Sequence, residues 1–258
     1  MKATLAVHKF SSCDGCQLAI LNAETRLVAL ADYFDIVHFL EAGPSNADAK
    51  VDIALVEGSI TTKHDVERIA NIRANSKLVV AIGACATSGG LQALRNLVDG
   101  QAWMQSLYPG PMPVEPLPNS TPLHEHIHVD AAIWGCPVNM DEVFTALLGL
   151  LQGAVPRDED EKVCATCKQK GYGCVMVEKK MACLGPVTKA GCGALCPGHA
   201  RGCYGCFGPA ENANVAALAG HFRDMDMSEE AIWQQFMLIY SHEKILANSF
   251  GGGHDQPH

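Results

Sequence analysis

Cysteine is the residue type in this sequence whose number and spacing point most directly to chemistry. Twelve cysteines occur in 258 residues, enough for three sets of four. Four thiolates are the ligand set of an iron–sulfur cluster and also of a structural zinc site. One set of four is scattered along the sequence: Cys13, Cys16, Cys85 and Cys136. The other eight lie close together: Cys164, Cys167, Cys174, Cys183, Cys192, Cys196, Cys203 and Cys206. The sequence therefore predicts several metal centres with thiolate ligands.

A disulfide framework is the alternative use of so many cysteines. Disulfides persist in oxidising compartments, and the segment Met1 to Phe10 has neither the apolar stretch nor the cleavage site of a signal peptide. We therefore expect free thiols in a cytoplasmic protein. No apolar run is long enough to cross a bilayer, so membrane insertion is not expected. The net charge of -9 disfavours nucleic acid and anionic lipid as partners and favours other proteins.

The first 152 residues predict a domain built on a parallel sheet. Short β-branched runs alternate with amphipathic stretches, which is typical of an α/β sheet covered by helices on both faces. The expected strands are 4–10, 35–40, 52–57, 78–83 and 129–134, and the expected helices are 17–32, 63–74 and 143–151. The proline-rich segment 108–122 is expected to be an irregular loop.

The scattered cysteines all follow the ends of expected strands. Cys13 and Cys16 follow the first strand, Cys85 follows the fourth and Cys136 follows the fifth. In open parallel sheets ligands bind outside the carboxyl ends of the strands, so the four thiols are expected at one edge of the sheet. A structural zinc site more often takes its ligands as local pairs. The scattered set therefore favours a buried iron–sulfur cluster.

The composition changes after residue 152 and predicts a second domain, 153–258. A charged connection, 156–162, is followed by a segment up to 209 that is dense in Cys and Gly, so we expect it to fold around metal. Chain order groups the first four of its cysteines around one centre and the last four around another, although neighbouring clusters can exchange ligands. Ser228 is expected to begin a helix with a buried stripe, and 251–258 to be a disordered tail.

Six short motifs occur in a fixed order between residues 10 and 209. They are Phe10-Ser-Ser-Cys-Asp-Gly-Cys-Gln17, Val56-Glu-Gly-Ser59, Gly83-Ala-Cys85, Gly135-Cys-Pro137, Cys183-Leu-Gly-Pro-Val-Thr188 and Cys203-Tyr-Gly-Cys206. Together they resemble the small, electron-transferring subunit of NiFe hydrogenases. The resemblance is greatest to the cytoplasmic multimeric class that exchanges electrons with NAD(P) or other soluble carriers, in particular to sulfhydrogenase delta subunits.

The resemblance implies a flavodoxin-like domain followed by an irregular iron–sulfur domain, with three 4Fe-4S clusters. The proximal cluster would lie next to a nickel–iron centre in a separate large subunit, and iron–sulfur and flavin NAD(P)-reductase subunits would be further partners. The implied ligands are Cys13, Cys16, Cys85 and Cys136 for the proximal cluster, Cys192, Cys196, Cys203 and Cys206 for the medial cluster, and Cys164, Cys167, Cys174 and Cys183 for the distal cluster.

This chain departs from the family pattern at three points. Cys164 stands where the distal cluster often has a histidine, Cys196 is available where the medial site often has a proline, and a twin-arginine signal is absent. These departures favour three 4Fe-4S clusters in a cytoplasmic enzyme. Glu57 matches the family's Glu-Gly motif, where it would either assist proton movement or orient a loop.

Other functions fit parts of the pattern. A stand-alone polyferredoxin-like carrier or a multi-zinc scaffold would also use sets of four cysteines. The homologous subunit of respiratory complex I resembles a sequence with adjacent cysteines after the first strand, whereas Cys13 and Cys16 are separated. Five lysines form the most basic part of the chain and either dock an acidic partner or only keep the domain soluble: Lys162, Lys168, Lys170, Lys179 and Lys180.

Overall fold

The protein folds into two compact units. The computed structural model describes residues 2–108, 110, 114–156 and 161–249. Unit 1 is Met1–Asp158 and unit 2 is Glu159–His258, so the division lies slightly beyond the predicted boundary at residue 152. The expected tail, 251–258, lies outside the described residues.

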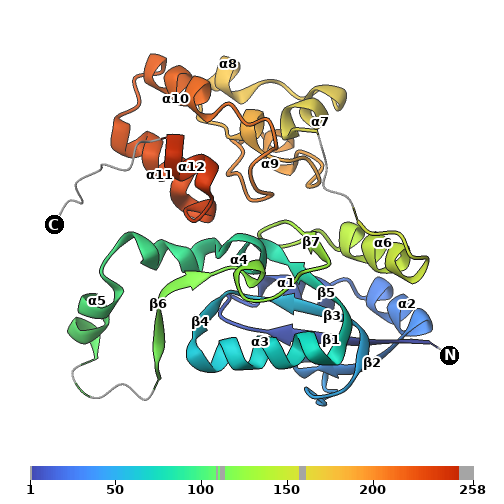
Figure 1. Cartoon of the computed structure of the whole chain (residues 1–258). Coiled ribbons are helices and arrows are strands. Elements are labelled where there is room, and N and C mark those ends of the chain that lie inside the picture. The colour runs from blue at the N-terminus through green and yellow to red at the C-terminus, as the bar shows by residue number, and fades with distance from the viewer. Residues whose placement is uncertain (1, 109, 111–113, 157–160, 250–258) are drawn as a thin grey trace. The chain divides into compact units, whose positions relative to one another are not determined.

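Unit 1 is organised around a five-stranded sheet in which all neighbouring strands are parallel (Figure 1). The strand order is β2-β1-β3-β5-β7. The strands are β1 (Ala3–Lys9), β2 (Phe34–Phe39), β3 (Val51–Glu57), β5 (Ser76–Ile82) and β7 (Ala131–Ile133). All five lie within a few residues of the strands expected from the sequence, and the predicted α/β class is confirmed.

Helices bury both faces of this sheet. Successive side chains of a strand point to opposite faces, and in β1 Leu5 and Val7 join one apolar cluster while Ala6 joins the other. The first cluster takes residues from α1 (Gly15–Leu21), α2 (Thr25–Tyr33) and α6 (Met140–Leu151), and the second takes residues from α3 (Lys63–Asn75). This two-sided burial explains why the strands are apolar runs and not alternating patterns.

The structure corrects two predictions for unit 1. The single helix expected over 17–32 is divided into α1 and α2, and Glu24 between them has a positive φ of 38°, which a continuous helix excludes. The expected loop 108–122 contains a strand, β6 (Pro116–Thr121), which pairs antiparallel with β4 (Ile60–Thr62). Its two prolines, Pro116 and Pro118, are tolerated because both strands of a two-stranded sheet are edge strands.

The remaining elements of unit 1 connect the sheet strands. They are η1 (Leu40–Ala42), α4 (Gly83–Ser88), η2 (Gly90–Leu97), α5 (Gly100–Leu107) and η3 (Leu123–Glu125). The sequence analysis did not predict α4, which begins where β5 ends. None of the described helices is both long and apolar enough to cross a membrane.

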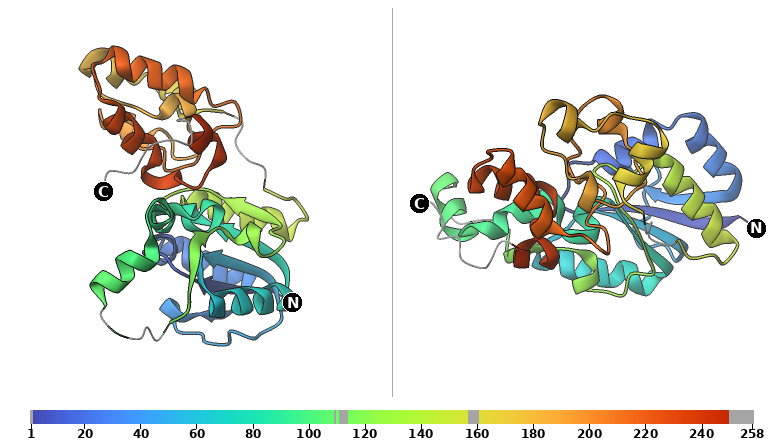
Figure 2. Two further views of the ribbon diagram at one scale, coloured as in Figure 1. Left: turned by 60° about the vertical axis from the view of Figure 1, so that its left-hand side comes forward. Right: turned by 90° about the horizontal axis from the view of Figure 1, so that it is seen from above.

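Unit 2 combines short turns of helix with a small helical bundle (Figure 2). The cysteine-rich part contains α7 (Val163–Gln169), α8 (Val175–Lys179), η4 (Gly185–Val187) and α9 (Leu195–Gly198), and the bundle contains α10 (Val215–Asp224), α11 (Glu229–Tyr240) and α12 (Lys244–Ser249). Ser228 caps α11 as predicted, and Phe222 packs on Phe236 with ring centroids 5.8 Å apart. Helix α10 was not predicted.

Candidate metal centres

The four scattered cysteines lie beyond the carboxyl ends of the parallel strands. Cys13 follows β1, Cys16 is in α1, Cys85 is in α4 directly after β5, and Cys136 follows β7. The loops that carry them are joined by a hydrogen bond from the backbone N–H of Ala84 to the carbonyl oxygen of Gly135, 2.8 Å long. The expected convergence of these segments at one edge of the sheet is therefore present.

Electrostatic coupling shows that the four thiols are neighbours. Burial raises the pKa of Cys85 to about 12, and the charges of Cys136 and Cys13 raise it further. The pKa of Cys16 is raised first by burial and then by Glu57, with smaller effects of Cys85 and Cys136. Thiols held close together in a buried place resist deprotonation, and a metal that supplies positive charge offsets this cost.

Two glycines, Gly83 and Gly90, make room for cysteine sulfur atoms, because a side chain at either position would overlap with a sulfur. A Cβ added to Gly83 would lie 2.3 Å from Cys16 Sγ, and one added to Gly90 would lie 2.8 Å from Cys85 Sγ. Both glycines also have positive φ angles, 81° and 55°, which favour glycine. A larger residue at either place would displace a ligand-type sulfur, so the backbone and the thiols fit a shared inorganic core.

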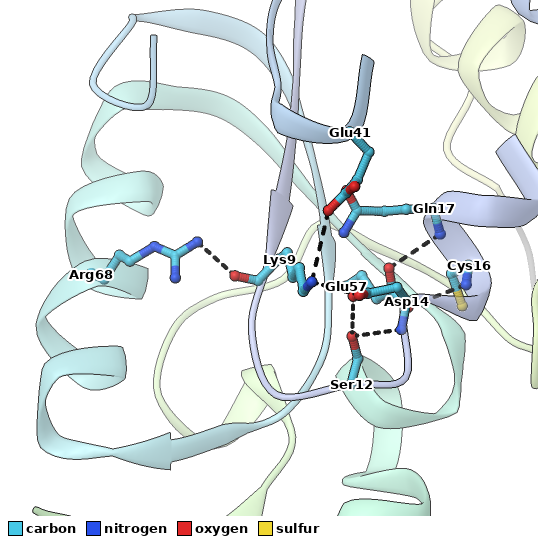
Figure 3. A network of polar contacts seen from close by, with 8 residues as sticks. All are labelled: Lys9, Ser12, Asp14, Cys16, Gln17, Glu41, Glu57 and Arg68. Atoms are coloured by element: carbon cyan, nitrogen blue, oxygen red, sulfur yellow. Dashed lines mark hydrogen bonds and ion pairs between the residues drawn. The ribbon is translucent and has the colours of Figure 1, made fainter. Parts of the chain in front are cut away.

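A polar network fixes the loop between Cys13 and Cys16 (Figure 3). Asp14 has a left-handed φ of 63°, and its carboxylate accepts hydrogen bonds from Lys9 Nζ at 2.5 Å and from Ser12 Oγ at 3.2 Å. Lys9 Nζ also lies 3.7 Å from the carboxylate of Glu41. Aspartate tolerates this backbone conformation better than most residues, and the ion pair holds it in place.

The loops after β1 and β3 are joined by reciprocal backbone hydrogen bonds. The N–H of Ser11 donates to the carbonyl of Ser59 at 3.2 Å, and the N–H of Ser59 donates to the carbonyl of Ser11 at 2.9 Å. Side-chain hydroxyls extend this pairing, since Ser11 Oγ lies 2.6 Å from Thr61 Oγ1 and Ser59 Oγ accepts from Ser120 Oγ at 2.8 Å. The segment that leads to Cys13 is therefore attached to the sheet before the first thiol is reached.

In unit 2 the first four cysteines of the second domain are electrostatic neighbours. Burial raises the pKa of Cys164 to about 11, and Cys183, Cys167 and Cys174 raise it further. A Cβ on Gly185 would lie 3.4 Å from the Sγ atoms of both Cys164 and Cys183. The structure therefore places together the four residues that chain order had grouped.

The last four cysteines of unit 2 are coupled as two pairs, Cys192 with Cys196 and Cys203 with Cys206. Burial is the main cause that raises the pKa of Cys203, to about 12, and among its further causes are the charges of Cys183 and Cys206. The pKa of Cys196 is raised by burial and by Cys192, with a smaller effect of Cys183. The N–H of Cys203 donates to Cys183 Sγ at 3.2 Å, so the two groups are adjacent through this contact.

The donor chemistry of all three groups suits iron–sulfur clusters. Each group consists of thiols, the ligands that 4Fe-4S clusters use, and all twelve cysteines are free of disulfides. In the part of the chain that the structure describes, no three His, Cys, Asp or Glu side chains form the close shell of a single metal ion.

Comparison with known proteins identifies the family. The model of the family described as NADH ubiquinone oxidoreductase, 20 Kd subunit, matches residues 13–150. The Pyrococcus furiosus protein named sulfhydrogenase 2 subunit delta is 34% identical over 226 residues, which cover 88% of this chain and 94% of that protein. This chain belongs to the NiFe hydrogenase small-subunit family. The predicted resemblance is confirmed.

Further relatives agree with this family. A protein of the F420-non-reducing hydrogenase vhu of Methanocaldococcus jannaschii is 31% identical, with 84% of this chain and 90% of that protein covered. A crystal structure of an NAD+-reducing NiFe hydrogenase in the H2-reduced state contains a chain that matches with a TM-score of 0.57 and 29% identity. That match covers 61% of this subunit and 95% of the other chain.

Glu57 of this hydrogenase subunit is placed to hold the loop that carries Cys16. Its side chain is 2% exposed, and its two carboxylate oxygens accept the backbone N–H groups of Cys16 at 3.2 Å and Gln17 at 3.1 Å. A carboxylate that accepts two N–H bonds at the start of α1 fixes the position of that helix. The geometry therefore favours the loop-orienting role over the proton-transfer role.

The sequence analysis of this hydrogenase subunit did not identify Lys9, Asp14 and Ser59 as residues that support the site. Aspartate between two cysteines was a usable signal, because it is one of the few residues that adopt positive φ.

The lysines of unit 2 have a structural use: Lys162 donates to Asn212 O, Lys170 to Gly193 O and Lys179 to Ala200 O. Their ammonium groups connect distant parts of the cysteine-rich segment.

Proposed function

We propose that this small subunit carries electrons one at a time through three 4Fe-4S clusters, between the nickel–iron site of a large subunit and a soluble electron acceptor. The observation that supports this proposal is that the twelve cysteines form no disulfide, while four of them converge at the edge of the sheet and four more are grouped around Cys164. Bound clusters of this type supply reversible one-electron chemistry. The protein contributes ligands, burial and charge, which set their reduction potentials.

Each set of four cysteines is assigned one cluster. Cys13, Cys16, Cys85 and Cys136 would hold the proximal cluster, Cys192, Cys196, Cys203 and Cys206 the medial cluster, and Cys164, Cys167, Cys174 and Cys183 the distal cluster. The hydrogen bond from Cys203 N–H to Cys183 Sγ supports electron passage inside unit 2, because it joins a medial ligand to a distal one. Glu57 would orient the proximal ligand loop.

The partners follow from the relatives. We assign a large subunit with the nickel–iron centre, and iron–sulfur and flavin NAD(P)-reductase subunits, since a structural relative is an NAD+-reducing NiFe hydrogenase. A cytoplasmic location fits the twelve free thiols, because reducing compartments keep cysteines unpaired.

Metal analysis of the anaerobically purified complex tests the cluster count. We expect a brown complex with about twelve irons per small subunit and an equal amount of acid-labile sulfide, since twelve thiolates at four per cluster allow three clusters. About three zinc ions per chain without sulfide would identify the zinc scaffold instead. Purification without a nickel-containing large subunit would favour the stand-alone carrier.

Replacement of a proximal ligand tests the first assignment. Cys136→Ser should abolish hydrogen-dependent dye reduction and remove about four irons, because a 4Fe-4S cluster needs its thiolates. Ser106→Ala, which changes an exposed hydroxyl of α5, is the control and should change neither quantity. Full activity of Cys136→Ser in an intact complex would remove this residue from the electron path.

Replacement of Cys164 tests the electron exit. Imidazole in place of thiolate raises cluster potential in Rieske centres, so Cys164→His should keep dye reduction but slow electron delivery to the natural acceptor. A redox titration of the distal cluster should show the higher potential. Equal rates with the natural acceptor before and after the substitution would place the exit elsewhere.

A further inference from the structure

Unit 1 contains a polar cavity that the cysteine chemistry does not use. Its volume is about 360 Å³, and it lies between α3 and the residues around 47–48, with His8 of β1 in its wall. The deeper part is formed by His8, Arg68 and Ile72, which are buried or half-buried. This volume lies within the range of small-molecule sites in proteins.

Arg68 lines this cavity, and its guanidinium is held by a backbone carbonyl and an aromatic ring. It donates one hydrogen bond to the carbonyl oxygen of Lys9 at 2.6 Å (Figure 3). Its central carbon lies 4.4 Å from the centre of the Phe10 ring. Among the described residues no carboxylate forms an ion pair with it, and burial lowers its pKa, only partly offset by Asp65. A half-buried cation held in this way is a receptor for a carboxylate, which guanidinium groups bind through two parallel hydrogen bonds.

His8 supplies a second polar group in the cavity wall. It is 3% exposed, it packs against His38 with ring centroids 4.7 Å apart, and no described residue makes a hydrogen bond with its imidazole. Burial, His38 and Arg68 lower its pKa to about 3, so at neutral pH it carries no charge. Buried polar side chains normally have a hydrogen-bond partner, and a ligand in the cavity would provide one.

The outer part of the cavity limits the charge of an occupant. Asp48 and Glu67 are exposed lining residues that carry negative charge, whereas His64 and Asn71 are polar. Like charges repel a multiply charged anion more strongly than a singly charged one. The lining therefore selects a small ligand with one negative charge.

We propose that this cavity binds a small molecule through a single carboxylate group, which is received by the guanidinium of Arg68, with the imidazole of His8 as a further hydrogen-bond partner. No cysteine lines this cavity, and Arg68 is connected to the loop of Cys13 and Cys16 through the carbonyl oxygen of Lys9.

Calorimetric titration of the intact complex in a chloride-free, low-salt buffer at pH 8 tests the site with acetate. We expect acetate to bind, and Arg68→Gln to weaken binding about tenfold or more, as expected when a hydrogen-bonded charge pair is lost. Lys63→Gln removes the same charge at the first position of α3 and should leave binding unchanged. Absence of acetate binding to the unaltered complex, or equal binding to Arg68→Gln, would overturn the proposal.

Exposed variants keep the test independent of folding. Inorganic phosphate, which is doubly charged at pH 8, should bind more weakly than acetate to the unaltered complex. Asp48→Asn combined with Glu67→Gln should reduce this preference without disturbing buried contacts, because both residues are exposed. Stronger binding of phosphate than of acetate, or a preference unaffected by the double substitution, would contradict the selection of a single carboxylate.

Discussion

The two units of this hydrogenase subunit use cysteine in different ways. In unit 1 the large apolar clusters on the two faces of the sheet hold the fold, and of the four cysteines at the edge of the sheet one, Cys16, belongs to such a cluster. In the cysteine-rich part of unit 2 the buried cluster is small, and Cys183 and Cys203 are themselves members of it together with Val163, Val175 and Ala194. A sheet can therefore carry a metal site, whereas a segment whose core consists partly of ligands depends on its metal.

Removal of iron should produce the largest difference in stability between the two units. After anaerobic chelation we expect residues 161–209 to lose protection from amide hydrogen exchange, while β1, β3 and β5 keep theirs, because Cys16 is the one assigned ligand in the large apolar clusters around these strands. Mass-spectrometric exchange of the complex before and after chelation measures this. Equal loss of protection in the two units would show that the sheet also depends on a cluster.

A methyl group at Gly83 should damage the proximal site while the sheet survives. Gly83→Ala would bring its Cβ within 2.3 Å of Cys16 Sγ at a φ of 81°, and such a backbone alone costs about 1–3 kcal/mol. We expect the loss of about four irons per chain. Gly220→Ala in α10 meets no atom within 4 Å and should instead stabilise by about 0.5–1 kcal/mol. Unchanged iron content in Gly83→Ala would refute the close approach.

Substitutions of Asp14 test how strongly the protein itself stabilises the loop between Cys13 and Cys16. Asp14→Gly keeps the φ of 63° without strain but loses the contacts with Lys9 and Ser12, whereas Asp14→Ala loses the contacts and retains a strain of about 1–2 kcal/mol. The rate of iron release to a chelator should therefore increase from the unaltered protein to Asp14→Gly and again to Asp14→Ala. If the two variants released iron equally, backbone strain at this position would have no effect.

The smallest expected effect concerns Asp52, which has no contact with the cysteines. The hydrogen bond from Lys77 and those from Thr4 lower its pKa from 3.8 to about 2. Its contribution to the stability of unit 1 is therefore complete well above pH 4 and is lost as the pH falls toward 2. Asp52→Asn should lower the urea midpoint at pH 7 and have a smaller effect at pH 3. An equal effect at both pH values would exclude the charge as the cause.

The sheet was predictable from the sequence because buried parallel strands leave short apolar runs rich in β-branched residues, which recur between helical stretches. The positions of Cys85 and Cys136 after such runs then placed them at one edge. The break between α1 and α2 was not predictable, since Leu18 and Leu27 fit one helix and only the positive φ of Glu24 divides it. Strand β6 was missed because its prolines hide its pairing with β4.

The supporting residues were harder to predict than the ligands. A cysteine is visible in a sequence by its type, but the pairing of Lys9 with Asp14, or of Ser11 with Ser59, depends on which strands are adjacent. Nothing in the sequence distinguishes Arg68 from an exposed helical arginine, whereas in the structure its guanidinium lies over the ring of Phe10. Long-range contacts of this kind follow from topology and not from local composition.

The paired backbones of Ser11 and Ser59 bear on the order of maturation. They attach the segment leading to Cys13 to the strands, so unit 1 can present its thiols in nearly final positions before any iron is delivered. The cysteine-rich segment of unit 2 has no comparable frame of apolar strands in its described residues, and its chain must close as its clusters arrive. Cluster insertion would then be a late loading step in the first unit and a part of folding itself in the second.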